Sequence, residues 1–143
     1  MSLNLAAPII AAISAESSIV ALLGTYNNAP SIHTRRPVPA DAEFPLIAIS
    51  PDITITDEDG VNDDRPVVRR DVAVYGDAIG HYRIVEDVGY MLRTMFHRQR
   101  DALTVTGYDV VDIRASGPMI APASDDTMVG RLVTLTIRLA SSS

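Results

Sequence analysis

Apolar and polar side chains alternate from Val133 to Leu139, near the end of the chain, and Val129 extends the apolar row. The apolar row is Val129, Val133, Leu135, Ile137 and Leu139, and Thr134, Thr136 and Arg138 lie opposite it. A repeat of two places neighbouring side chains on opposite faces of a β-strand. Because a strand with one apolar face needs a second layer to cover that face, this pattern predicts a sheet packed against other elements.

Further segments also have strand patterns. The predicted strands are, in chain order, 31–34, 45–49, 53–56, 66–75, 111–115 and 129–139. Pro45–Ile49 is continuously apolar, which predicts a strand buried on both faces, and Pro51 should bend the chain there or place it at a sheet edge. Within the other strands, Val68, Val72 and Val74 are expected to share one face, as are Val111, Ile113 and Ala115.

Two segments have the spacing of amphipathic helices. The first, Leu3–Leu23, has one apolar stripe before a polar break at 14–18 and a second stripe after it, and Gly24 is a suitable stop. Asp77 is expected to cap the second helix, which should run to about Arg98. Its apolar stripe is Ile84, Val85, Val88, Leu92, Met95 and Phe96.

When only the main strands are counted, the order is helix, strand, strand, helix, strand, strand, which predicts an α+β fold. We expect a mostly antiparallel sheet of about four main strands, with two helices packed on one face. A length of 143 residues and an apolar content of 47% favour a single domain over 1–143, with a flexible acidic loop at about 57–65 and a frayed tail at 141–143. The apolar stretch Ala6–Ile13 is too short to cross a membrane.

The negative charge of the chain is concentrated in one short segment. The formal net charge is −6, and residues 52–66 contribute −5 of it, whereas residues 67–143 have nine arginines and nine acids. The simplest interpretation is a solvated surface loop. A chain this acidic is not expected to hold nucleic acid, because phosphate binding needs a cationic surface.

No pattern of residues predicts catalysis. His33, His81 and His97 are isolated from one another, there is no cysteine, and the glycine after Asp57 stands at the wrong position for a calcium loop. We therefore predict no catalytic residue, no metal site and no cofactor, and a protein that is not an enzyme. A small metal-dependent enzyme that uses the acidic segment is a remote alternative.

Patterns of apolar residues and turns along nearly the whole chain match a known family. They are Ile19–Gly24, Ser31–His33 leading to Pro37, Phe44–Ile49, Asp71–Gly76 before the helix with Leu92, and Gly130–Ile137. In these features the chain resembles the tail completion proteins of long-tailed bacteriophages and gene-transfer particles, also called tail terminators or head–tail joining proteins.

The resemblance implies a structural role in a virion. Such proteins form a six-membered ring on the head-proximal end of the tail tube, stop its polymerisation and join the tail to the head connector. The implied partners are further copies of the chain, the tail tube protein and the head connector or stopper protein, with DNA passing through the channel without specific binding. The implied location is the virion tail, assembled in the host cytoplasm. Another connector or head-completion protein, or an unrelated adaptor, is the alternative.

Two groups of charged residues are candidates for contacts in such an assembly. The acidic group, which faces either the DNA channel or the tube and connector, is Asp57, Glu58, Asp59, Asp63 and Asp64. The arginines that are candidates for contacts between subunits or with partners are Arg35, Arg36, Arg69, Arg70, Arg98 and Arg100. The simpler interpretation of His97–Arg100 is that these residues complement a helix dipole.

Overall fold

The structure is a computed structural model that describes residues 5–34, 43–50, 54–57, 65–121 and 127–141. The helices are α1 (Ala6–Ser14), α2 (Ser17–Val20), α3 (Tyr82–Phe96) and the short 3-10 helix η1 (Arg100–Ala102). The strands are β1 (Thr25–Tyr26), β2 (Ala29–Pro30), β3 (Ile32–His33), β4 (Leu46–Ile49), β5 (Thr54–Asp57), β6 (Pro66–Asp77), β7 (Tyr108–Ile120) and β8 (Met128–Ser141).

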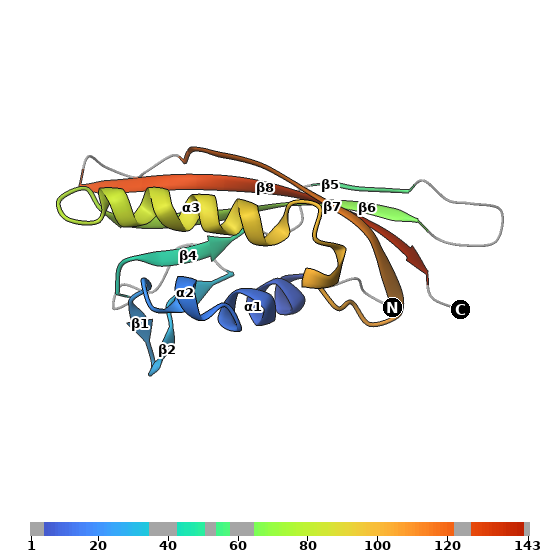
Figure 1. Cartoon of the computed structure of the whole chain (residues 1–143), viewed down its shortest axis with the longest axis horizontal. Helices are drawn as coiled ribbons and strands as arrows, with labels where there is room; N and C mark the ends of the chain where they lie inside the picture. The colour runs from blue at the N-terminus through green and yellow to red at the C-terminus, as the bar shows by residue number, and fades with distance from the viewer. Residues whose placement is uncertain (1–4, 35–42, 51–53, 58–64, 122–126, 142–143) are drawn as a thin grey trace.

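One sheet forms the centre of the fold (Figure 1). Its strand order is β3-β4-β6-β8-β7, and β5 also pairs with β6. Only the β3–β4 pair is parallel among the pairs of this sheet in the described ranges; the others are antiparallel. The prediction of an α+β fold with a mostly antiparallel sheet is therefore confirmed.

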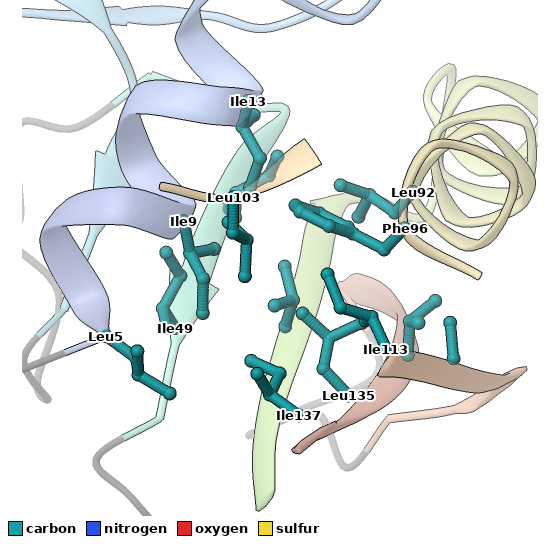
Figure 2. Close-up of a cluster of buried hydrophobic side chains, with 14 of the residues drawn as sticks. Leu5, Ile9, Ile13, Ile49, Leu92, Phe96, Leu103, Ile113, Leu135 and Ile137 are labelled. Carbon is teal, nitrogen blue, oxygen red and sulfur yellow. The ribbon is translucent and has the colours of Figure 1, made fainter. Parts of the chain in front are cut away.

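Helices α1 and α3 cover the same face of the sheet, as predicted. Figure 2 shows Leu92 and Phe96 of α3 on one side of the apolar core and Ile9 and Ile13 of α1 on the other, with Leu103 between them. All four helix side chains are fully buried. The row predicted for β8 also faces this core: Val133, Leu135, Ile137 and Leu139 are buried, and Val129 packs against them.

The opposite face of the sheet is apolar at one end and polar at the other. Leu46, Ala48 and Tyr75 belong to a second, smaller buried cluster there. Farther along the same face, the Thr134 hydroxyl donates a hydrogen bond of 2.7 Å to Asp71 Oδ1. Because Leu46 and Ala48 face this cluster and the other two residues of β4 face the main core, the predicted burial of β4 on both faces is confirmed.

The β4–β5 side of the sheet is interrupted at Ser50. Ile49 pairs with Val72 and Thr54 pairs with Arg69. Between these two pairs, the β4–β5 side has two more residues than β6. Ser50 bridges the start of the break: its N–H donates to the Asp71 carbonyl and its Oγ accepts from the Asp71 N–H, both at 2.9 Å. The predicted effect of Pro51 falls outside the described residues.

Both predicted helices are shorter in the structure. The first divides into α1 and α2 around Ala15 and Glu16, within the polar break, and α2 ends at Val20. The second begins at Tyr82 because β6 continues to Asp77, so Asp77 is not its cap. The residue before the helix is His81, whose Nδ1 accepts a hydrogen bond of 3.2 Å from the Asp77 N–H.

Two local features differ from what the sequence predicts. Val111 is 46% exposed, because a bulge between Val110 and Asp112 turns it away from the core that contains Ile113 and Ala115. The hairpin β1–β2 was not predicted; Asn27 and Asn28 have φ angles of 51° and 63° at its turn, where such turns require positive φ.

Within the described ranges, the helices all fall short of the length and apolar character that crossing a membrane requires.

Candidate functional site: the α3–β7 edge

Exposed large apolar side chains are confined to a few elements of the described chain. The large ones in the part of the chain that the structure describes are Ile79, Tyr82, Tyr90, Val111, Met119 and Ile120. They come from the turn before α3, from α3 and from β7. The described residues of α1, α2 and β1 to β4 contribute none of them. We name this surface the α3–β7 edge; Ile79 and Ile120 are its most exposed members, at 94% and 80%.

One side of α3 contributes polar and aromatic residues to this edge. Tyr82, Glu86, Tyr90, Arg93 and His97 recur every three or four positions, which places them on one side of a helix. In the sequence, these positions alternate with the apolar positions that face the core. The sequence of α3 therefore specifies both a buried stripe and a neighbouring partly exposed stripe.

Arg131 of β8 contacts the residues of this stripe that lie in the first turns of α3. Its Nη2 donates hydrogen bonds to the Tyr82 hydroxyl at 3.0 Å and to Glu86 Oε1 at 3.2 Å. The guanidinium carbon lies 5.2 Å from the centre of the Tyr82 ring, within the range of a cation–π contact. Because only 12% of the Arg131 side chain is exposed, its guanidinium has little freedom to move, and it positions the exposed Tyr82 ring.

The end of α3 is bonded directly to β7. His97 Nδ1 accepts a hydrogen bond of 3.1 Å from the Ala115 N–H, and the Arg98 N–H donates one of 2.7 Å to the Ile113 carbonyl. Arg98 adopts the left-handed conformation, with φ of 59°, that commonly ends a helix. Helix and strand are thereby fixed in register along the edge.

A hollow of about 590 Å³ lies between α3 and β7. The described residues that line it are Tyr90, Arg93, His97, Arg114, Ala115, Ser116, Gly117 and Thr136. This set contains two guanidinium groups and no carboxylate, although Arg114 Nε donates to the nearby Asp112 Oδ2 at 3.2 Å. The lining of the hollow therefore includes several hydrogen-bond donors, and Asp112 offsets part of the positive charge of Arg114.

The predicted acidic site falls largely outside the described residues. Asp57 is the last residue of β5 and pairs with Pro66 in β6. Glu58, Asp59, Asp63 and Asp64 lie beyond the described ranges, as do Arg35 and Arg36.

The other predicted arginines lie in different surroundings. Arg69 is exposed on β6. Arg70 is only 7% exposed and lies on the same side of β6 as Val68 and Val72, which face the core. Arg98 and Arg100 are both exposed, directly after α3 and at the start of η1. Of the described members of this group, Arg98 and Arg100 lie where the end of α3 meets β7.

Most residues of this edge were not predicted from the sequence. Tyr90 and Arg93 stand outside the apolar stripe of α3, which is a weak signal of exposure. Arg114 lies between Ile113 and Ala115 in the sequence, which predicts the opposite face of the strand, but no sequence pattern predicts that it lines the same hollow as Arg93. Ile120 is 80% exposed and pairs with Arg131 after a second irregularity of β7, between Ser116 and Met119.

The histidines form separate local contacts. His33 is buried, with its Nε2 2.9 Å from Ser31 Oγ and its ring in an edge contact with Tyr26. His81 and His97 form the backbone contacts given above. Within the described ranges, no three or more histidine or acidic side chains are grouped closely enough to hold a metal ion.

The left-handed conformation of Arg98 leads to a stability prediction. Replacing Arg98 by glycine should raise the free energy of unfolding by about 0.5–1 kcal/mol, because glycine adopts this φ without a steric penalty and keeps the N–H that bonds to Ile113. Urea unfolding followed by circular dichroism measures the change. The matched control is Arg100→Gly in η1, which should not stabilise the chain; a lower stability of Arg98→Gly would contradict the interpretation.

The features above define a two-layer α+β protein in which α3, the turn before it and β7 expose large apolar side chains. A chain in a solved structure of the "Virion of native gene transfer agent (GTA) particle" has a similar fold. The TM-score is 0.76 and the sequence identity is 14%, and the similarity covers 94% of this chain and 93% of that chain. At this identity the similarity establishes the fold alone. No protein-family model and no curated protein matches the sequence.

Proposed function

We propose that this chain is a structural component of a phage-like virion and that it acts as a tail terminator. The observation that carries the proposal is the fold similarity to a chain of a gene transfer agent virion, which extends over nearly the full length of both chains. An α3–β7 edge rich in exposed apolar groups supports it, because such surfaces are typical of proteins that assemble.

In the proposed role, copies of the chain form a ring of six on the head-proximal end of the tail tube. The ring ends polymerisation of the tube and presents a surface to the head connector. A closed ring of identical subunits is built from a head-to-tail contact between two different patches of the same chain. In this role the protein acts through its shape and its association with other subunits, and it catalyses no reaction.

Removal of the protein from particle-producing cells tests this role. Electron microscopy of the lysate should show overlong tails and heads without tails, and a plasmid copy of the gene should restore joined particles. The purified protein should have a mass of about 92 kDa, six times 15.4 kDa. Normal joined particles in the absence of the protein would refute the proposal, and heads that leak DNA beside tails of normal length would indicate a head-completion protein instead.

The acidic segment has two possible roles in such a ring. Six copies bring together a formal charge of about −36, most of it from residues 52–66. Carboxylates that face the channel would repel DNA phosphates and let the genome slide. Carboxylates that face along the axis would instead attract a basic rim of the tube or connector.

Neutralising the acidic segment separates these roles. The variant replaces Asp52, Asp57, Asp59, Asp63 and Asp64 by Asn and Glu58 by Gln. For acids in the channel, we expect normal particles whose DNA ejection is slowed, measured by dye release from triggered particles. For acids on the axis, we expect long or unjoined tails in micrographs. If both assembly and DNA ejection are normal, neither role is correct, and these acids only keep the surface solvated.

A further inference from the structure

We propose that the hollow between α3 and β7 is a binding site for a small organic phosphate. The site lies within a single subunit, so it does not depend on the proposed function. Three observations carry it: the hydrogen-bond donors that remain available in the lining, the pairing of the nearby acids, and the volume of the hollow.

Arg93 provides the main positive charge of the proposed site. It is half-buried and lines the hollow. Within the part of the chain that the structure describes, its guanidinium forms no hydrogen bond and no ion pair. Because partial burial removes some of the water around a charged group, an anion that supplies acceptor oxygens there replaces the lost hydration.

Arg114 contributes a second guanidinium from β7. Its Nε donates to Asp112 Oδ2 at 3.2 Å, which leaves the N–H groups of both Nη atoms available to a ligand. Asp112 offsets the charge of Arg114, so the charge of Arg93 remains as a formal excess. Glu86 is paired in the same way with Arg131, at 3.2 Å. The described residues that line the hollow include none of the acids of α3 and β7.

Neutral donors accompany these charges. The hydroxyls of Ser116 and Thr136 line the hollow and, within the described ranges, form no hydrogen bond. His97 Nδ1 accepts the Ala115 N–H, so the ring proton lies on Nε2, which is therefore a donor.

These donors come from three elements, α3, β7 and β8. A carboxylate has two oxygens in one plane and is satisfied by a single guanidinium. A phosphate monoester has three acceptor oxygens that point in different directions. Donors that surround a hollow from three elements therefore fit a phosphate better than a carboxylate.

The hollow is larger than a single phosphate ion. Its volume of about 590 Å³ lies within the range typical of small-molecule sites, about 300–1,000 Å³. Tyr90, which is 64% exposed, also lines it and provides an aromatic surface for the organic part of a ligand. The volume and the aromatic ring together favour a phosphate ester over free phosphate.

Isothermal titration calorimetry of the purified full-length protein tests the proposal, with phenyl phosphate as the probe. We expect phenyl phosphate to bind with a Kd of about 1 mM or below. Inorganic phosphate lacks the ring, and phenylacetate has the ring on a planar carboxylate. Each of these two compounds should bind about tenfold more weakly than phenyl phosphate, or weaker still.

Arg93→Gln should weaken the binding of phenyl phosphate by about tenfold or more, because it removes a charged donor. The matched control is Arg83→Gln, which changes an exposed arginine of the same helix outside the lining and should bind as the wild type does. Circular dichroism establishes that both variants are folded. No binding of phenyl phosphate at about 10 mM, or equal binding by Arg93→Gln, overturns the proposal. Equal affinity for inorganic phosphate or phenylacetate overturns the class of ligand.

Discussion

Replacing Phe96 by alanine should lower the free energy of unfolding by about 3–5 kcal/mol. Phe96 is fully buried and is the last residue of α3. Its ring points into the core between α3 and the sheet, on the side where Leu103 lies (Figure 2). Removing the ring deletes apolar contacts and leaves a cavity that the surrounding strands cannot close, because long paired strands hold their positions.

Urea unfolding at a fixed protein concentration measures this loss. The matched control is Ile79→Ala, which removes a large apolar side chain that is 94% exposed. The control should change the stability by less than about 0.5 kcal/mol. A similar loss in both variants would mean that Phe96 is not in the core.

Replacing Gly117 by alanine should destabilise the chain by about 3–4 kcal/mol. Gly117 has a φ of 112°, which L-residues rarely adopt, and a Cβ atom there would lie 2.6 Å from the Leu132 carbonyl oxygen. The neighbouring strand would have to move to accept the methyl group. Since Leu132 belongs to β8 and pairs with Met119, such a movement would disturb the pairing of β7 with β8.

Gly80 provides a comparison that separates the effect of the close contact with β8 from the effect of a positive φ. It has a similar φ of 102°, but an added Cβ would meet no described atom within 4 Å. Gly80→Ala should therefore cost only the conformational penalty of about 1–2 kcal/mol. Urea unfolding of the two variants measures the difference, and equal losses would show that the close approach of Gly117 to β8 contributes nothing.

The main elements of the fold were predictable because their patterns have no competing interpretation. The alternation from Val129 to Leu139 fits only a half-buried strand, and the spacing of Val85, Val88, Leu92 and Phe96 fits only a helix. The ends of elements were less predictable. Asp77 is a good capping residue in isolation, but pairing with Met128 keeps it in β6. Tertiary pairing thus overrides a local preference that the sequence alone expresses.

The candidate site was much less predictable than the fold. It depends on the approach of α3 to β7, two elements that are separated in the sequence, as the positions of Arg93 and Arg114 illustrate. It also depends on a bulge of β7 that turns Val111 outward without any change in the residue pattern. The arginines selected from the sequence show the same limit, since Arg69 is exposed and the adjacent Arg70 is buried.

The bonds from His97 and Arg98 to β7 have a consequence for how copies of this chain can stack. An outer strand normally offers free amides and carbonyls on which a foreign strand can grow, the first step toward fibrils. Here the Ala115 amide and the Ile113 carbonyl are already occupied at the middle of that strand. A foreign strand that paired with this part of β7 would first have to break both bonds, so the middle of the outer strand is protected from the pairing that starts a fibril.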